Sequence, residues 1–386
     1  MNDEHKSLPH VATSKKISIF GATGVVGQKS VETAYFAGHD IVVITGHKNH
    51  AELIRQANKY NPQYVCCTDA DCYRKVKSEV NGSEVLPGDE VMNVAKLDID
   101  CCIMAISGLA SLAPTFACLG HANRLAIASK EAILLGGETL IDSARSRHTE
   151  LIPLDSEHNA IFRCVKHDHR HSVTEVILTA SGGAFLNHTE DALKSVTLSD
   201  ALQNPNWAMG AKVTVDSATL INKATEIIEA ALLFDLPINM VKYVVHPESI
   251  IHGIVRFCDN SYKALLSQPD MMIPIMYAIN YPELQQCYTS TPLAFTAIGQ
   301  LTFRTQQVWQ ERNVNLAYDV FNDGKVIAFT IANEIAVSRF LDGSVMFCEI
   351  YDLVVRMLNM CDRELAHSYD DITELTRHYI ERFTKV

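Results

Sequence analysis

The segment KISIFGATGVVG, residues 16–27, places a short β-prone run directly before three glycines, and residues 28–36 after them are compatible with a helix. Strand, glycine turn and helix in this order form the setting that a dinucleotide site requires. Gly21 permits a tight turn, Gly24 lets backbone N–H groups approach a pyrophosphate, and Gly27 allows the helix to pack closely on the strand. The segment therefore predicts a Rossmann-like domain at the start of the chain.

The second predicted strand, residues 41–45, ends in Gly46-His47-Lys48-Asn49. An NAD site would place an acidic residue at this point to bind the ribose 2′-hydroxyl, whereas a basic residue accommodates a 2′-phosphate. Lys48, with His47 beside it, therefore indicates NADP(H). The alternative is that Lys48 is a solvated loop lysine.

The alternation of strand and helix continues, with predicted strands at residues 64–68, 100–106 and 125–128. Small or polar residues follow each of them, and open parallel sheets bind ligands at the carboxyl ends of their strands. Lys130 comes just after the last of these strands, in a position to bind substrate oxygens. A surface ion pair with a neighbouring side chain is the alternative.

The composition is that of a globular protein, because 386 residues suit two or three domains and 47% of them are hydrophobic. A net charge of −12 argues against nucleic acid or an anionic membrane as partner, since either would need a basic face. Residues 1–15 are expected to be a disordered tail, and no apolar run reaches the ~18 residues of a membrane helix. The 11 cysteines form no C-x-x-C pair, so we expect buried thiols in a reducing cytoplasm.

The segment LIPLDSEHNA, residues 151–160, breaks an apolar run with two carboxylates one residue apart. Alternate side chains of a strand share a face, so Asp155 and Glu157 would leave its end in the same direction. Converging carboxylates favour Mg²⁺ or Mn²⁺ over zinc. The alternative is a helix start, with Asp155 or Ser156 as N-cap and Glu157 in the first turn.

Residues 216–231 show the spacing of one amphipathic helix. Its polar face carries an amide, an ammonium group and a carboxylate, from Asn222, Lys223 and Glu226. One interpretation gives the first two to a phosphate and Glu226 to a metal. The other makes Lys223 and Glu226 an exposed ion pair three residues apart.

Other segments are less informative. A predicted strand at residues 176–179 ends in Ser181-Gly182-Gly183, where backbone amides and a hydroxyl can hold an anion. Trp207 lies on a turn-rich segment that suits a lid over a ligand, with core anchoring as the alternative. The hydrophilic run at residues 167–171 is expected to be a solvated loop, and His246 and His252 receive no role.

Together these segments resemble the 1-deoxy-D-xylulose 5-phosphate reductoisomerase family, from about Lys16 to about Met360. The motifs that carry the resemblance are residues 21–27 (GATGVVG), Lys130-Glu131 after a strand, residues 154–162 (LDSEHNAIF), Ser181-Gly182-Gly183, residues 205–210 (PNWAMG), residues 215–226 (VDSATLINKATE), residues 267–271 (SQPDM) and residues 332–335 (ANEI).

The resemblance implies rearrangement of 1-deoxy-D-xylulose 5-phosphate and its reduction by NADPH to 2-C-methyl-D-erythritol 4-phosphate, with Mg²⁺ or Mn²⁺ as metal. It implies a cytoplasmic homodimer in the α/β class. The expected parts are a Rossmann-like NADPH domain at 16–153, a catalytic and dimerisation α+β domain at 154–281, a connector at 282–309 and a C-terminal α-helical domain at 310–386.

The resemblance also implies the site residues. The metal ligands are Asp155, Glu157 and Glu226, which with Lys130 form the catalytic set. The substrate residues are Lys130, Ser156, Glu157, Ser181, Asn204, Trp207, Ser217, Asn222, Lys223 and Glu226, with the phosphate on Ser181, Ser217, Asn222 and Lys223. The cofactor residues are Gly21, Thr23, Gly24, Val25, Val26, Gly46, Lys48, Asn49, Ser129, Glu131 and Gly210.

The sequence departs from the family pattern at several positions. Asn204 stands where the flap usually has histidine, Ser129 replaces asparagine, Ala184 replaces proline, Ala224-Thr225 replaces Gly-Leu, and Val25 replaces a frequent serine. None of these changes removes a metal ligand, so we expect retained activity with altered affinity. An Asn204→His variant should accordingly lower the KM for the substrate.

Two other functions remain open on the sequence. A semialdehyde-dehydrogenase-type NADP oxidoreductase also opens with Gly-Ala-Thr-Gly, but it needs a cysteine nucleophile paired with a histidine. A non-enzymatic NADP-binding redox sensor would bind the nucleotide without metal-dependent NADPH oxidation. Alkylation of thiols should abolish the first activity, whereas a chelator should abolish the reductoisomerase reaction.

Overall fold

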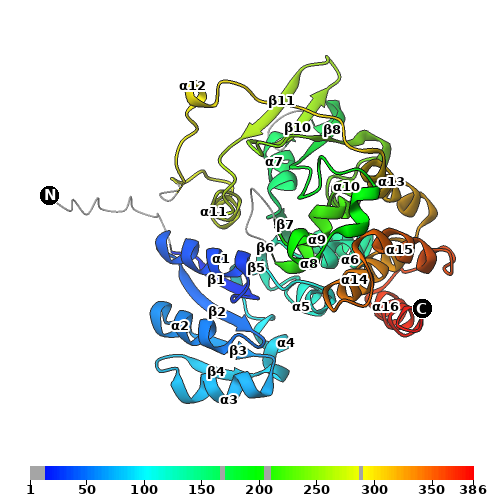
Figure 1. Ribbon diagram of the computed structural model, residues 1–386. Helices are drawn as coiled ribbons and strands as arrows, with labels where there is room; N and C mark the ends of the chain where they lie inside the picture. Colours follow the sequence, from blue (N-terminus) through cyan, green and yellow to red (C-terminus); the bar gives the residue numbers. More distant parts are fainter. Residues whose placement is uncertain (1–13, 166–169, 204–209, 287–289) are drawn as a thin grey trace.

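The computed structural model describes residues 14–165, 170–203, 210–286 and 290–386. Figure 1 shows the N-terminal part of the chain, in blue and cyan, as a layered unit below the green central part. The C-terminal helices, in orange and red, lie against the central part. The predicted α/β class is confirmed, and Asn204 and Trp207 lie outside the described residues.

The N-terminal unit contains a parallel sheet of seven strands in the order β4-β3-β2-β1-β5-β6-β7. The strands are β1 (Lys16–Phe20), β2 (Asp40–Gly46), β3 (Tyr64–Cys67), β4 (Glu84–Pro87), β5 (Ile99–Met104), β6 (Ala122–Ile127) and β7 (Glu150–Pro153). Strand β1 pairs with β2 on one side and with β5 on the other, so the strand order reverses there. Open α/β sheets bind their ligands at such a switch point.

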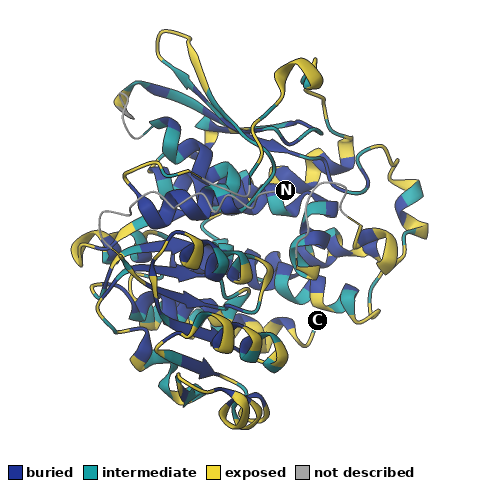
Figure 2. Cartoon of the chain, turned by 90° about the vertical axis from the view of Figure 1, so that its left-hand side faces the viewer, coloured by how far each residue is buried: buried dark blue, intermediate teal, exposed yellow. Residues whose placement is uncertain are grey.

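Helices cover both faces of this sheet, which explains why its strands are apolar on both sides. Side chains of α1 (Val25–Phe36), α2 (His50–Tyr60) and α3 (Ala70–Glu79) pack with Ile17 and Ile19 of β1. Phe20 faces the opposite core, with α4 (Val91–Val94), α5 (Leu112–Ala117) and α6 (Lys130–Ser146). Figure 2 shows these strands as buried and the outer helix faces as exposed.

The turn after β1 confirms the steric part of the glycine prediction. Gly21 has φ 82°, and a Cβ there would lie 2.5 Å from the carbonyl oxygen of Ala105. A Cβ on Gly27 would lie 2.1 Å from the carbonyl oxygen of Gly21. Both positions therefore need glycine, whereas a Cβ on Gly24 would meet only an ordinary contact, 3.5 Å away.

The central part contains a second, mixed sheet in the order β11-β10-β8-β9. Its strands are β8 (Val173–Ala180), β9 (Val241–Val245), β10 (Ile251–Phe257) and β11 (Tyr262–Leu266). Helix α7 (Ser156–Val165) packs on β10, and Gly253 permits that approach because a Cβ there would lie 3.1 Å from the carbonyl oxygen of Glu157. The short strands β4 and β9 have no counterpart among the predicted strands.

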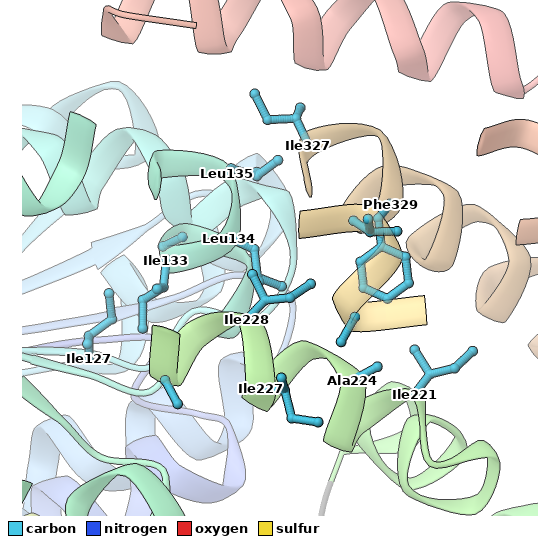
Figure 3. Close-up of a cluster of buried hydrophobic side chains, with 14 of the residues drawn as sticks. Ile127, Ile133, Leu134, Leu135, Ile221, Ala224, Ile227, Ile228, Ile327 and Phe329 are labelled. Atoms are coloured by element: carbon cyan, nitrogen blue, oxygen red, sulfur yellow. The ribbon is translucent and has the colours of Figure 1, made fainter. Parts of the chain in front are cut away.

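The prediction of a single helix over residues 216–231 is wrong. Two helices occupy this region, α9 (Ala211–Thr219) and α10 (Ile221–Phe234), and Leu220 between them has φ 59°. A residue in the left-handed region breaks the helical path, although apolar residues of both helices pack in the same core. Helix α10 packs on α6, and Figure 3 shows Ile228 of α10 in one cluster with Leu134 and Phe329.

The C-terminal part is helical, as expected, but its first helix begins earlier than residue 310. The helices are α13 (Val308–Asp323), α14 (Val326–Leu341), α15 (Ile350–Leu358) and α16 (Tyr369–Phe383). Helix α13 contacts α10, and α14 contacts α6 and α9, so the C-terminal helices support the central part. Shorter helices α8 (Leu198–Ala201) and α12 (Phe295–Ile298) lie in the intervening segments.

Helix α11 (Met272–Asn280) packs against α1 of the N-terminal unit, although it follows the second sheet in the chain. Its Ile275 and Ile279 belong to the same hydrophobic core as Ile17. Lys15 and Arg124 donate to the carbonyl oxygen of Ile279, at 3.0 and 3.2 Å, at the negative end of this helix. The segment therefore joins the two sheets.

Most cysteines in the described part of the chain are buried, as predicted, and Cys258 is the exposed one there. In the ranges that the structure describes, we find no helix with both the length and the apolar character to cross a membrane.

Candidate active site

A cavity of about 200 Å³ lies between the glycine turn, α7, the end of β8 and α10. All predicted metal and substrate residues in the described ranges line it: Lys130, Asp155, Ser156, Glu157, Ser181, Ser217, Asn222, Lys223 and Glu226. These residues come from four separate stretches of sequence. The fold therefore brings residues of separate sequence motifs together around one cavity.

The first two carboxylates follow β7 directly, where the chain turns into α7. The Asp155 carboxylate accepts a hydrogen bond of 3.2 Å from the backbone N–H of Glu157, and α7 begins at Ser156. Asp155 thus satisfies a free N–H of the first helical turn, which is the cap interpretation. Its other oxygen faces Lys130, so capping the helix and serving the site are compatible.

Glu226 completes a group of three carboxylates. Asp155, Glu157 and Glu226 each offer one oxygen, and these oxygens lie within 4.8 Å of one another. An all-oxygen set of this kind suits Mg²⁺ or Mn²⁺ and lacks the nitrogen or sulfur ligands that zinc usually recruits. The residues present therefore fit the predicted metal.

Two lysines hold the negative charge of this group. Lys130 Nζ bonds to Asp155 and lies 3.0 Å from Glu226 Oε1. Lys223 Nζ lies 2.8 Å from Glu157 Oε1 and also bonds to Glu226. Lys223 and Glu226 are buried, at 2% and 1% exposure, so the interpretation of an exposed surface pair is wrong.

The surroundings set the charge states of these groups. Burial alone would lower the pKa of Lys130, but the neighbouring carboxylates raise it well above its usual range. Burial would raise the pKa of Asp155, and attraction to Lys130 reverses this and lowers it. Burial and the nearby Glu226 raise the pKa of Glu157 to about 7. Lys130 and Asp155 are therefore charged at neutral pH.

The predicted phosphate residues all line this cavity. Ser181 follows β8, Ser217 lies in α9, and Asn222 and Lys223 lie in the first turn of α10. Besides its two carboxylates, Lys223 donates to the carbonyl oxygen of Thr179 at 2.5 Å. All three of its protons thus have protein acceptors, which ties it to the carboxylate group as well as to this wall.

A second cavity of about 250 Å³ adjoins the first and shares Val25, Lys130 and Gly210 with it. Six predicted cofactor residues line it: Gly24, Val25, Val26, Ser129, Glu131 and Gly210. It lies at the carboxyl edge of the parallel sheet, beside the switch point between β1 and β5. The cofactor and substrate predictions therefore fall in neighbouring cavities.

The remaining predicted cofactor residues do not line either cavity. Gly21 and Thr23 belong to the turn after β1, and Gly46 ends β2. Lys48 is exposed beyond that strand, where a 2′-phosphate could reach it. The Asn49 side chain instead accepts a hydrogen bond of 3.2 Å from the backbone N–H of Glu52 and caps α2.

Three residues near the site had no role in the sequence predictions. Glu229 is buried, and its Oε2 lies 3.6 Å from Lys130 Nζ; burial raises its pKa to about 7. His158 is buried, and its Nε2 lies 2.9 Å from the carbonyl oxygen of Glu226, so the ring donates there. His252 lines the first cavity. The spacing of three residues after Glu226 and after Asp155 was the available signal for Glu229 and His158.

No cysteine among the described residues lines either cavity. A semialdehyde-dehydrogenase-type reaction needs a thiol nucleophile beside a histidine. Burial raises the pKa of Cys66 to about 12 and likewise raises that of Cys67, so these thiols are unreactive. The cavities therefore offer carboxylate, ammonium and hydroxyl chemistry.

Comparison with known proteins covers nearly the whole chain. Family profiles match residues 17–137 (1-deoxy-D-xylulose 5-phosphate reductoisomerase), 151–234 (its C-terminal domain) and 266–381 (DXP reductoisomerase C-terminal domain). The 1-deoxy-D-xylulose 5-phosphate reductoisomerase of Caldanaerobacter subterraneus subsp. tengcongensis is 36% identical over 96% of this chain and 99% of its own length. The one from Wolbachia sp. subsp. Drosophila simulans is 38% identical over 94% of this chain and 93% of its own.

Solved structures agree with these relatives. The Zymomonas mobilis 1-deoxy-D-xylulose 5-phosphate reductoisomerase in complex with NADPH superimposes with a TM-score of 0.88 at 30% identity, covering 97% of this chain and 99% of that one. A DOX-P reductoisomerase in complex with NADPH, fosmidomycin and magnesium gives a TM-score of 0.90 at 30% identity, covering 96% and 98%.

Proposed function

The chain belongs to the 1-deoxy-D-xylulose 5-phosphate reductoisomerase family, and from this we propose that it converts 1-deoxy-D-xylulose 5-phosphate to 2-C-methyl-D-erythritol 4-phosphate with NADPH and Mg²⁺ or Mn²⁺. The observation that carries the proposal is the group of Asp155, Glu157 and Glu226, which forms ion pairs with Lys130 and Lys223 in one cavity. A similar solved structure is that of a DOX-P reductoisomerase in complex with NADPH, fosmidomycin and magnesium, which supports this choice of cofactor and metal.

The residues around the cavity have separable tasks in this proposal. Asp155, Glu157 and Glu226 would hold the cation, which supplies Lewis-acid polarisation of substrate oxygens. Lys130 stays protonated because of its carboxylate neighbours, so its ammonium group can donate to a substrate oxygen and stabilise negative charge there. Ser156 is the nearby hydroxyl, and it donates to Glu157.

The phosphate wall orients the substrate. Ser181, Ser217 and Asn222 line the cavity and carry hydroxyl and amide groups that could bind a phosphate. A phosphate held there fixes the carbon skeleton without taking part in bond changes, so its binding energy is available for orientation. Two further residues stabilise the carboxylate group indirectly. Glu229 forms an ion pair with Lys130, and His158 donates to the backbone carbonyl oxygen of Glu226 in α10.

The cofactor would lie along the turn after β1. The N-terminus of α1 would hold its pyrophosphate, and the exposed Lys48 would offer a positive charge to a 2′-phosphate. NADPH would supply the hydride, and Val25, Lys130 and Gly210 line both the cofactor-side cavity and the substrate cavity. We also propose a homodimer and the expected division into NADPH, catalytic and C-terminal helical domains.

The decisive experiment follows NADPH absorbance with 1-deoxy-D-xylulose 5-phosphate as substrate. Oxidation is expected with Mg²⁺ or Mn²⁺ and should stop after chelation and return when metal is restored. Treatment with a thiol-alkylating reagent is the control, and it should leave the activity intact. No turnover under any metal would overturn the proposal, and a loss on alkylation alone would favour the semialdehyde-dehydrogenase alternative.

A further inference from the structure

A second charged cluster, separate from the carboxylate group, borders the cofactor-side cavity. Its centre is Lys212, in the first turn of α9, two residues after Gly210. Lys212 Nζ lies 2.8 Å from Asp216 Oδ2, 3.1 Å from Glu131 Oε1 and 3.6 Å from Glu334 Oε2. These partners belong to α9, α6 and α14, so one ammonium group joins three helices.

The cluster continues beyond Lys212 on both sides. Asn333 of α14 donates to Asp216 Oδ1 at 2.9 Å, and both residues are buried. Burial would raise the pKa of Glu131, but Lys212 and the backbone of Gly108, in the loop after β5, lower it. The cluster therefore connects the C-terminal helices to the edge of the parallel sheet.

Glu131 links this cluster to the carboxylate site. Glu131 is the second residue of α6, directly after Lys130, which faces the carboxylate group. Glu131, Lys212 and Asn333 line the cofactor-side cavity, whereas Lys130 lines both cavities. Any shift of the first turn of α6 would therefore move Lys130 and the wall between the two cavities together.

The charges make Lys212 the member that matters most. It is the one cation among the described side chains of the cluster, and it faces three carboxylates. Burial would lower the pKa of Lys212, but attraction to Asp216 and Glu131 raises it, so the side chain is charged at neutral pH. Without that charge, three carboxylates would repel one another across the junction of α6, α9 and α14.

We propose that Lys212 is a positioning residue, which fixes the first turn of α6 and the start of α9 so that the cofactor cavity and the carboxylate site keep their mutual geometry. The inference rests on the proposed function for the identity of the two ligands. It concerns no contact between Lys212 and substrate or metal. Its consequence is that loss of Lys212 should weaken the cofactor side and hydride transfer while leaving metal affinity intact.

The test replaces Lys212 with methionine, which keeps the length of the side chain and removes the charge. The matched control is Lys194→Met, because Lys194 forms an exposed ion pair of 2.9 Å with Asp191, outside both cavities. NADPH affinity is measured by fluorescence titration, Mn²⁺ affinity by electron paramagnetic resonance, and kcat and KM by turnover. Lys212→Met should weaken NADPH binding at least tenfold and lower kcat, with Mn²⁺ affinity and the substrate KM within threefold of the parent protein.

A second pair of variants separates positioning from simple destabilisation. Lys212→Arg retains the charge and should bring NADPH affinity back to within threefold of the parent protein. Glu334→Gln removes the most exposed carboxylate of the cluster, is not expected to impair folding, and should weaken NADPH binding about twofold to fivefold. If Lys212→Met does not fold, Glu334→Gln carries the test.

The outcomes are separable from those of the proposed function. The inference is overturned if Lys212→Met binds NADPH as Lys194→Met does, or if folded Glu334→Gln is indistinguishable from the parent protein when Lys212→Met cannot be measured. Equal losses of NADPH and Mn²⁺ affinity would also overturn it, since they indicate general loosening. If the parent protein binds NADPH but does not reduce 1-deoxy-D-xylulose 5-phosphate, the proposed function fails while the binding test of Lys212 still stands.

Discussion

The glycine turn after β1 and the carboxylate group beside α7 face adjoining cavities, but opposite physical means hold them in place. The turn depends on missing side chains, because Gly21 and Gly27 each approach a carbonyl oxygen too closely to admit a Cβ. The carboxylate group depends on charges, since Asp155, Glu157 and Glu226 form ion pairs with the half-buried Lys130 and the buried Lys223. Added side-chain atoms should therefore disrupt the turn, whereas a change of charge should disrupt the carboxylate group even when the side-chain shape is kept.

The largest expected effect comes from Glu226→Gln, which removes a charge and keeps the shape. Loss of one metal ligand should lower kcat/KM at least about a thousandfold, roughly 4 kcal/mol of transition-state stabilisation, and weaken Mn²⁺ binding in parallel. Glu229 still faces Lys130, so the free energy of unfolding should change by less than about 2 kcal/mol. Turnover, metal titration and thermal unfolding measure the three quantities.

Glu229→Gln is the matched control for this prediction. Glu229 lies on the same buried face of α10, 3.6 Å from Lys130, and is not one of the three clustered ligands. It should leave Mn²⁺ affinity within threefold of the parent protein. If both variants lose metal affinity equally, the assignment of Glu226 as a ligand and Glu229 as a supporting residue is wrong.

The contrast also explains what the sequence could predict about the fold. A missing side chain is visible as a letter, so the glycine turn could be placed on residues 21–27 with its strand and helix. Helix-prone residues on both sides hid the break at Leu220, because a left-handed residue leaves no mark on apolar spacing. Strands β4 and β9 were not predicted, and length is not the reason, because β3 has four residues like β4 and was predicted.

The carboxylate group shows a different limit. Spacing suggested that Asp155 and Glu157 converge, but periodicity alone could not bring Lys130 and Glu226 to them from other segments. Only the family resemblance joined these motifs. Glu229 was missed because the sequence does not distinguish a buried glutamate that faces Lys130 from an exposed helical glutamate.

Gly27→Ala should have the next largest effect. It changes no charge, and it should lower the stability of the folded protein. Its Cβ would lie 2.1 Å from the carbonyl oxygen of Gly21, so α1 must move away from the turn. We expect a loss of about 3 kcal/mol in the free energy of unfolding and at least tenfold weaker NADPH binding. Denaturant unfolding and fluorescence titration measure these, and Mn²⁺ affinity should stay unchanged.

Gly24→Ala is the control in the same turn. Gly24 has φ −77° and ψ 171°, which alanine adopts readily, and its Cβ would meet the Gly21 oxygen only at 3.5 Å. The unfolding free energy should stay within about 1 kcal/mol, although a bound pyrophosphate needs the space and NADPH affinity should fall. Equal destabilisation by the two alanines would show that packing of α1 is not the reason for Gly27.

A third prediction concerns pH and the buried His252. Burial lowers its pKa to about 4, against an ordinary value near 6.5, so between these pH values the unfolded chain binds the proton and the folded chain does not. The contribution to stability is complete above pH ~6.5 and is lost progressively as the pH falls to about 4, up to about 3 kcal/mol. The free energy of unfolding, measured for the parent protein and for His252→Gln across this pH range, isolates the contribution of His252.

Other groups titrate in the same range, so the difference between the two proteins is the quantity to compare. His252→Gln should lose less stability than the parent protein on acidification from pH ~6.5 to ~4. Parallel curves for the two proteins would mean that His252 is protonated in the folded chain, which its burial argues against.

The smallest effect is expected at Lys48, which carries the same charge as Lys130 but lies exposed at the end of β2. Lys48→Ala should weaken NADPH binding about fivefold, roughly 1 kcal/mol, and leave NADH binding unchanged, because only NADPH has the 2′-phosphate. High salt should shrink the difference, since an exposed pair is screened. An equal loss for both nucleotides would remove Lys48 from the cofactor site. A salt-sensitive fivefold effect here, beside a thousandfold effect at Glu226, would show that burial decides how much a single charge contributes in the two neighbouring sites.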